Sequence, residues 1–451
     1  MSREVRPAAT DIAANAARAA RWELSALAAT LAGAGSELPV TGGMKRYIHL
    51  DHAAGAPPLA AVRRAVERTL PLYGAVAGNG FRSELARELY RACRDTVIDF
   101  VGADRERHAV IFGRSTSQLV DGAARSVPFD GNDIVMVTGL EHESNELPWR
   151  RVARVARIEP DAQGFLSEDA IEAGFRRYRG RVRVLAVTGA SNVTGTIPDT
   201  SALADLAHRH GAKIFVDAAQ LAPRRRVRTG TGDRELDFIA LSGQKLYAPF
   251  GASALVCPRE LRDGSELEVG VEAGKPDLLG AIAMAQACRV LAGSVMDAVA
   301  ERERSLTRLL LAGLRRIPQV TVYGSSDLEL GRDRIGIVPF NVLGVRHETV
   351  AEALSMRFGI GVGCGSFGAP SLVTRLLGYP ELSLARPAER LDGRGVVRVS
   401  LGLSNDERDV EALCNAVADI ADAPERARVG PTERLQRESD IEAFSRDLFE
   451  P

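Results

Sequence analysis

Short runs of apolar and β-branched residues alternate with longer amphipathic stretches along most of the 451-residue chain. Each short run is almost continuously hydrophobic, which is typical of a strand buried on both faces of a sheet. The stretches between them repeat their apolar residues at helical spacing. The alternation predicts a mostly parallel sheet covered by helices on both faces. The predicted strands span 109–112, 134–137, 182–187, 213–216, 238–241 and 252–256, and the predicted helices span 60–70, 83–103, 116–125, 168–178, 200–210 and 277–294.

The pattern changes near residue 294. A long helix to about residue 316 leads into strands at 319–323, 335–342 and 396–400 and helices at 347–357 and 405–422, which together predict a smaller α+β domain. Before the first strand, the spacing predicts an amphipathic helix over about 10–32, followed by a loop over 33–43. The expected organisation is a helical extension (1–45), a large α/β domain (46–295), a smaller C-terminal α+β domain (296–425) and a charged tail (426–451).

Composition narrows the class of protein. Hydrophobic residues make up 45% and charged residues 26% of the chain, and the formal net charge is −1, so neither nucleic acid nor an anionic membrane is an expected partner. No apolar run approaches the roughly 18 residues that a membrane span needs. The five cysteines are scattered without CxxC spacing. We therefore expect a cytoplasmic protein without a disulfide framework or a structural zinc site.

Polar side chains stand where the predicted strands end. Asp217 closes one apolar strand, and Lys245 lies in a small-residue turn after the next. Ligands of parallel sheets bind beyond the C-terminal strand ends, so these groups are expected to meet. An amine and a carboxylate suit pyridoxal phosphate, which needs an amine for its aldehyde and an anion for its ring nitrogen. Further candidates at the same edge are Ser115, Thr116, Ser117, His142 and Asn192.

Each of these residues also has a simpler interpretation. The hydroxyls at 115–117 begin a predicted helix, so they form either a phosphate cradle or an ordinary N-cap. His142 either stacks on a flat heteroaromatic ring or is a solvated loop residue, and Asp217 either pairs with a pyridinium or caps a turn. Arg398 interrupts an apolar strand and is expected to hold a carboxylate, from the protein or from a substrate. The basic run at 224–228 is expected to be a solvated loop.

Other cofactor sites find no support in the sequence. No GxGxxG follows a predicted strand and no GxxxxGK[ST] occurs, which argues against dinucleotide and P-loop sites. His and Cys residues form no cluster with metal-ligand spacing, so no metal site is expected.

Seven motifs together resemble one family. They are LDHAAGAPP (50–58), EHESNELPW (141–149), SNVTGT (191–196), VDAAQ (216–220), SGQKLYAPFG (242–251), EAGKPD (272–277) and RVSLGLSN (398–405). From about Tyr47 to Ala423 the chain resembles fold-type I pyridoxal phosphate enzymes of the class V aminotransferase family. The similarity is to the branch of cysteine desulfurases and selenocysteine lyases.

The resemblance implies a role for each matching residue. Lys245 would form the internal aldimine and later move a proton, Asp217 would pair with the pyridine nitrogen, and His142 would stack on the ring. Further cofactor contacts would come from Ser115, Thr116, Ser117, Asn192, Gln220, Ser242, Gln244 and Lys275. Asn192 and Arg398 would bind the substrate carboxylate, and Ser366 lies in the loop expected to set substrate selectivity.

Three positions depart from the family pattern. Gln244 stands where the family usually has His. Lys275 replaces a Thr that reaches the phosphate of the partner subunit, a placement that implies a homodimer with shared sites. Gly368 stands where the nearest pattern has the sulfur-accepting cysteine, and Cys364 lies four residues earlier. Cys364 is therefore not expected to accept sulfur, since that chemistry needs a thiolate within reach of the substrate.

We expect a pyridoxal phosphate enzyme that acts on a small amino acid, as a desulfurase-like C–S or β-elimination lyase without a persulfide. The alternatives are a class V aminotransferase, an epimerase or a decarboxylative C–C bond-forming enzyme, because all of them share the same early chemistry. An alternative of another kind is a catalytically silent binding protein with this fold.

Overall fold

A seven-stranded sheet forms the centre of the larger part of the protein. The computed structural model describes residues 24–76, 78–161, 163–249, 252–262, 276–324, 333–379 and 394–449. The strand order is β4-β10-β9-β8-β7-β5-β6, and only β10 runs antiparallel to its neighbours. The predicted α/β architecture with a mostly parallel sheet is confirmed. The strands are β4 (His108–Gly113), β5 (Ile134–Thr138), β6 (Arg154–Ile158), β7 (Val182–Thr188), β8 (Lys213–Asp217), β9 (Phe238–Ser242) and β10 (Ser253–Pro258).

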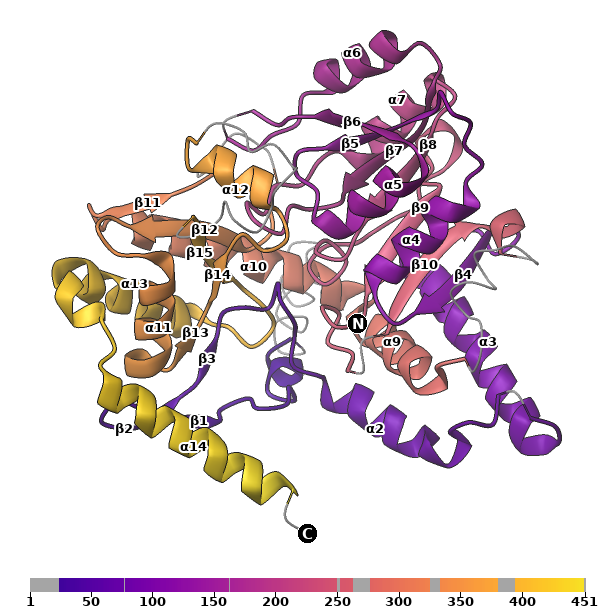
Figure 1. The fold of residues 1–451 in the computed structure, drawn as a ribbon. Helices are drawn as coiled ribbons and strands as arrows, with labels where there is room; N and C mark the ends of the chain where they lie inside the picture. Colours follow the sequence, from indigo (N-terminus) through magenta and orange to yellow (C-terminus); the bar gives the residue numbers. More distant parts are fainter. Residues whose placement is uncertain are drawn as a thin grey trace, which may run out of the picture.

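Helices cover both faces of this sheet (Figure 1). Alternate residues of one strand divide between two cores: Ile134 and Met136 pack into one, Val135 and Val137 into the other. The first core includes residues of α2 (Ala60–Thr69), α3 (Phe81–Val101), α6 (Glu168–Tyr178), α7 (Thr200–Arg209) and α9 (Leu278–Leu291). The second includes residues of α4 (Thr116–Ser126) and α5 (Leu147–Val152).

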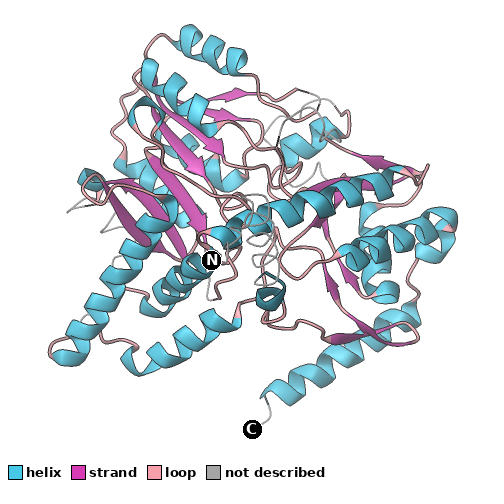
Figure 2. Ribbon diagram, turned by 180° about the vertical axis from the view of Figure 1, so that it is seen from behind, coloured by secondary structure: helices cyan, strands magenta, loops and turns pink. Residues whose placement is uncertain are grey.

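A second, antiparallel sheet forms the smaller part, and Figure 2 shows the two sheets in separate halves of the molecule. Its order is β11-β12-β15-β14, with β11 (Val320–Val322), β12 (Ile337–Val342), β15 (Val396–Ser400) and β14 (Gly363–Gly365). Its core also takes residues from α10 (Ser294–Arg315), α11 (His347–Phe358) and α13 (Glu407–Asp422).

The segment that precedes residue 51 belongs to this smaller core. Strand β3 (Ile48–His49) pairs in parallel with β13 (Ile360–Gly361), and Ile48 and Leu50 are buried in the small core. The sequence assigned this segment to the large domain. Leu24 and Leu31, earlier in the chain, are buried in the core of the large sheet, so the chain passes from the large part to the small one and returns through the loop that begins at Asp51.

Several local predictions were wrong or incomplete. The expected loop at 33–43 contains strand β1 (Glu37–Val40), which pairs with β2 (Gly43–Arg46) in an exposed hairpin that lacks an apolar run. The edge strand β6 and the short helices α5 and α12 (Pro370–Leu376) were also missed. The predicted N-terminal helix lies mostly outside the described residues, although residues 24–28 are helical.

Near the C-terminus, α14 (Pro431–Phe449) runs past the hairpin, where the Thr41 hydroxyl donates a hydrogen bond to Glu433 at 3.0 Å (Figure 1). Over the described residues, no single helix has the length and apolar character of a membrane span. Only α9 and α10 taken together do, and they bend by 75°.

Candidate active site

The residues expected to meet at the C-terminal edge of the large sheet lie there. Asp217 ends β8 opposite Ala240 of β9, and Lys245 follows β9 after three residues. Ser253 pairs with Gly113 on one side and with Ser242 on the other, so the start of α4 lies at the same edge. The order of the strands thus brings an amine, a carboxylate and a helix N-terminus together.

A tight turn presents Lys245. The backbone N–H groups of Lys245 and Leu246 donate to the carbonyl of Ser242 at 3.2 and 3.0 Å. A side chain at Gly243 would collide with the carbonyl of Ala252, so this turn requires glycine. Tyr247 has a φ of +60°, and its hydroxyl accepts a hydrogen bond from the backbone N–H of Leu403 at 2.9 Å. The turn is thereby fixed to the loop that follows β15.

The Lys245 amine sits among charged groups. Burial lowers the pKa of Lys245, and the negative charge of Asp217 opposes that shift. Two nearby cations, Arg398 and Arg224, lower the pKa of Lys245 further. Asp217 also accepts a hydrogen bond from the N–H of Ala219 at 3.0 Å, so it caps a turn while remaining beside the amine. The amine is therefore easier to deprotonate than an exposed lysine.

His142 keeps a fixed orientation. Its Nδ1 accepts a hydrogen bond from the backbone N–H of Ser144 at 3.0 Å and lies 2.8 Å from the Ser144 hydroxyl. Burial lowers the pKa of His142, as do the positive charges of Lys245 and Arg398, whereas Asp217 raises it. The neutral ring consequently carries its proton on Nε2.

A buried carboxyl group, Glu141, lies beneath these residues and was not among the candidates from the sequence. It accepts hydrogen bonds from the N–H of Thr188 at 2.9 Å and from the amide of Asn145 at 2.7 Å, and also from the Thr138 hydroxyl. Burial raises the pKa of Glu141 to about 8, and the charge of Asp217 contributes in the same direction. Its position directly before His142 was the only available signal.

Arg398 already has a carboxylate partner. Its guanidinium lies 2.6 Å from Asp51, donates to the carbonyl of Asn192 at 3.1 Å and stacks 4.0 Å above the Phe367 ring. The Asn192 amide donates to the carbonyl of Phe367 at 2.8 Å. The expected carboxylate is thus one of the protein's own, and neither Asp51 nor Phe367 was a candidate from the sequence.

The loop after β14 closes against His142. The carbonyl of Gly368 accepts a hydrogen bond from the N–H of Glu143 at 2.7 Å, and a Cβ at Gly368 would meet the His142 ring. Phe367 and Gly368 both have positive φ, +55° and +66°. Ser366 is half-buried, and its carbonyl accepts a hydrogen bond from Ala369.

Cys364 lies on β14, where it pairs with Val397. Its side chain is free and exposed to solvent. Desolvation raises the pKa of Cys364, and the negative charges of Glu348 and Asp51 raise it further. The surroundings therefore favour a thiol over a thiolate.

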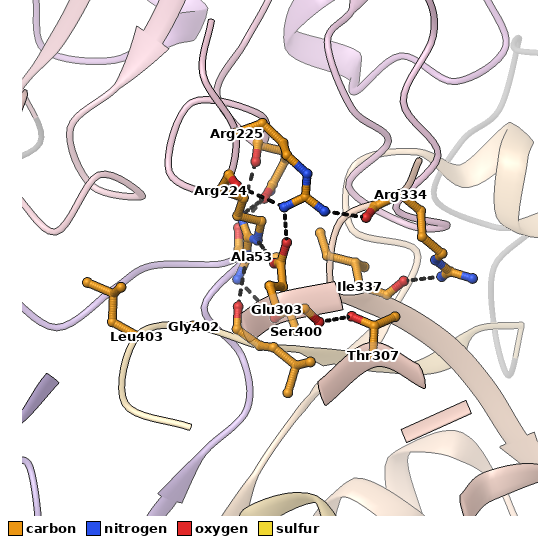
Figure 3. A network of polar contacts seen from close by, with 12 residues as sticks. Ala53, Arg224, Arg225, Glu303, Thr307, Arg334, Ile337, Ser400, Gly402 and Leu403 are labelled. Carbon is orange, nitrogen blue, oxygen red and sulfur yellow. Dashed lines mark hydrogen bonds and ion pairs between the residues drawn. The ribbon is translucent and has the colours of Figure 1, made fainter. Parts of the chain in front are cut away.

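The basic run at 224–228 is only in part the solvated loop that the sequence predicted, because Arg226 and Arg228 are exposed whereas Arg224 and Arg225 are buried. Arg224 and Arg225 are only 4% and 7% exposed. Both contact the buried carboxylate of Glu303, at 3.0 and 2.6 Å (Figure 3). The prediction was wrong for these two residues because local composition does not show a distant acidic partner on α10.

The proposed phosphate-binding residues surround the start of α4. Ser115 caps this helix by accepting a hydrogen bond from the N–H of Gln118 at 3.2 Å, as an ordinary N-cap does. Thr116 is half-buried and Ser117 exposed beside it, while Ser242 is buried at the end of β9. The helix start still offers backbone N–H groups and hydroxyls to an anion. Gln244 is exposed, and Lys275 lies outside the described residues.

This donor set fits pyridoxal phosphate. An amine, a carboxylate, an imidazole and a helix N-terminus complement its aldehyde, ring nitrogen, ring face and phosphate. Two buried atoms near Arg398, its own Nε and Oδ1 of Asn192, have no hydrogen-bond partner within the described part of the chain, so the site can still accept polar groups. Among the residues described, no group of His, Cys, Asp and Glu side chains is arranged to hold a metal ion.

Comparison with known proteins agrees with this geometry. Residues 48–413 match the family described as Aminotransferase class-V. A cysteine desulfurase of Klebsiella pneumoniae (strain 342) is 30% identical over 361 residues, which cover 72% of this chain and 85% of that protein. One from Haloferax volcanii is 28% identical and covers 82% of this chain and 88% of its own. The apo structure of cysteine desulfurase from Thermococcus onnurineus NA1 is similar with a TM-score of 0.72 and 26% identity, and the match covers 83% of this chain and 95% of that one.

Proposed function

Because the chain belongs to the aminotransferase class-V family and is a pyridoxal phosphate enzyme of its cysteine desulfurase-like branch, we propose that it cleaves the C–S bond of a small amino acid by β-elimination. The sulfur then leaves as a free thiol or as sulfide. A persulfide mechanism needs an enzyme thiol to accept the sulfur atom, whereas elimination needs none.

Different residues of the site would bind different parts of the cofactor and of the substrate. Lys245 would hold the cofactor aldehyde, Asp217 would keep its ring nitrogen protonated and the start of α4 would hold its phosphate. Bound pyridoxal phosphate withdraws electrons from the α-carbon of the substrate. Arg398 and Asn192 supply the groups that suit the α-carboxylate.

Proton transfer follows from the two perturbed bases. With its pKa lowered, the Lys245 amine can take the α-proton at neutral pH. The electron pair released at the α-carbon expels the sulfur from the β-carbon. His142 carries a proton on Nε2 toward the loop side, where it can neutralise the departing thiolate. Addition of water to the remaining three-carbon unit gives pyruvate and ammonia, so the reaction balances without an oxidant or a reductant.

One observation carries the proposal. At the position where the resemblance puts a sulfur-accepting cysteine, Gly368 packs its backbone against His142 and leaves no room for a side chain. The nearby thiol of Cys364, on β14, is exposed and has a raised pKa. A persulfide route would need a thiolate at one of these two positions.

Product analysis with cysteine and with S-substituted cysteines tests the proposal. Elimination gives pyruvate in an amount equal to the released sulfide or thiol, with no reductant required, and Cys364→Ala retains this activity. Formation of alanine, together with the mass of an added sulfur atom on a Cys364 peptide, would refute elimination and support sulfur transfer.

We also propose a homodimer. Three large apolar side chains between the end of α2 and the start of α3 are exposed: Leu70 is 52%, Tyr73 69% and Phe81 80% exposed. A second subunit would cover them. Sedimentation of the purified protein tests this, and a monomer at micromolar concentration would refute it.

A further inference from the structure

Arg224 has a set of contacts that the proposed mechanism does not use. Its Nη1 donates to the backbone carbonyl and to the side-chain oxygen of Gln220, both at 3.1 Å, and its Nη2 donates to the carbonyl of Leu401 at 3.4 Å. Its Nε lies 3.0 Å from a carboxylate oxygen of Glu303 (Figure 3). The guanidinium is therefore held by three separate segments of the chain.

These contacts determine which way the Gln220 amide points. Its oxygen accepts from Arg224, and its nitrogen donates to the carbonyl of Ala53 at 2.9 Å. A flipped amide would set its NH2 group against the guanidinium and its oxygen against that carbonyl, which are two repulsive pairs. Within the described chain, the second hydrogen of the Gln220 nitrogen enters no hydrogen bond given by the structure, so it remains available to a ligand.

Arg224 is not needed to neutralise Glu303. Arg225 already lies 2.6 Å from the second oxygen of that carboxylate and is also paired with Asp333 at 2.9 Å. A buried ion pair adds little net stability compared with apolar packing. The second arginine therefore contributes something besides the neutralisation of this carboxylate.

The charge of Arg224 also reaches the catalytic amine. After burial, the groups that act on the pKa of Lys245 are Asp217, which raises it, and Arg398 and Arg224, which lower it. Arg224 lowers the pKa of Arg398 in the same way. Removal of this charge should therefore shift the titration of the Lys245 nitrogen upward.

We propose that Arg224 is a positioning residue of the active site, which orients the Gln220 amide so that its free N–H faces the bound cofactor. The inference rests on the proposed function, because the residue acts through the pyridoxal phosphate site. It gives a role to a basic segment that the sequence left without a function.

The experiment compares Arg224→Gln, Arg224→Lys and Gln220→Ala in the cofactor-loaded, full-length protein. The readouts are the pH dependence of the visible absorption of bound pyridoxal phosphate and its release rate into buffer. Arg224→Gln should raise the apparent pKa of this absorption change, because a positive charge that lowers the pKa of Lys245 is lost. Arg224→Lys should keep the wild-type pKa, because it retains the positive charge. It should release the cofactor about tenfold faster, because lysine cannot reproduce the guanidinium hydrogen bonds to Gln220.

A double variant separates orientation from general destabilisation. If Arg224 acts through Gln220, Arg224→Lys combined with Gln220→Ala releases the cofactor no faster than Gln220→Ala alone. Arg225→Gln is the matched control, because that side chain is equally buried on the same carboxylate but does not contact Gln220.

The outcomes are distinct. Wild-type titration and release rate in the Arg224 variants would overturn the inference, as would equal changes in Arg225→Gln. A wild-type protein that shows no visible absorption with pyridoxal phosphate would instead refute the proposed function.

Discussion

Substitution of Gly368 by alanine tests whether the backbone of the loop after β14 is fitted to His142. A Cβ at this position would lie 2.8 Å from Cδ2 and 3.0 Å from Cε1 of His142, and closer still to Nε2. Ordinary carbon contacts are near 3.5–4.0 Å, so either the ring or the loop must move by about 1 Å. The φ of +66° adds strain for any residue with a side chain.

The expected cost has two parts. Placing a side chain in the left-handed backbone region costs roughly 1–2 kcal/mol. Overpacking against a buried ring adds about 1–3 kcal/mol. Gly378→Ala isolates the first part, because Gly378 has a φ of +73° and a Cβ there would meet nothing within 4 Å. The difference between the two variants therefore measures the contact with His142.

The assay is chemical denaturation of both variants together with steady-state kinetics of C–S cleavage. Gly368→Ala should be less stable than Gly378→Ala by about 1–3 kcal/mol. A displaced His142 should also lower kcat/KM by roughly tenfold or more, while Gly378→Ala keeps the wild-type value. Equal stability and equal kinetics in the two variants would refute the packing argument.

Three further predictions follow from the same site. Lys245→Ala should lose the visible absorption of bound pyridoxal phosphate, and a dialysed variant that keeps this absorption would contradict the assignment of the amine. Asp51→Asn leaves a buried guanidinium unpaired and should lower the unfolding free energy by about 3 kcal/mol; a carboxylate ligand should restore more stability to this variant than to wild type in thermal melts. Because the pKa of Glu141 is raised to about 8 from 4.5, its contribution to stability is complete below about pH 4.5 and is lost as pH rises through about 8. Urea denaturation between pH 5 and 8 should therefore show a decline in the wild type that Glu141→Gln lacks, and parallel curves would count against a buried, protonated carboxyl.

The sequence predicted the large sheet because the inner strands of this sheet are continuous apolar runs. It missed β6, where two arginines interrupt the apolar residues, and the hairpin β1–β2, whose residues are exposed apart from Val40. Periodicity reports burial, so strands at an edge or on the surface give little signal. The same limit explains why the segment at 48–50 was assigned to the wrong side: an apolar strand does not show which core it enters.

At the candidate active site, the strand ends and the family resemblance predicted that Lys245, Asp217 and His142 lie near one another. They could not identify groups whose role depends on a distant partner. The sequence around Glu141 and Arg224 gives no sign of their partners. In the fold, Glu141 is buried near Asp217, and Arg224 donates a hydrogen bond to the side chain of Gln220. Long-range electrostatic partners come from tertiary structure, which local composition does not encode.

In the proposed function, the substrate carboxylate and the loop after β14 would use the same two side chains, Asn192 and Arg398. Asn192 and Arg398 suit an α-carboxylate, yet here the amide of Asn192 binds the Phe367 carbonyl and the guanidinium of Arg398 stacks on the Phe367 ring. A ligand that takes both groups must displace Phe367, and Gly368 would move with it from His142. Part of the binding free energy of the carboxylate then offsets the free energy needed to open the loop. The apparent affinity of the ligand therefore depends on the stability of the closed loop as well as on the contacts with Asn192 and Arg398. The identity of residue 367 should accordingly set how large a substrate the open loop admits, since this side chain stacks on the Arg398 guanidinium.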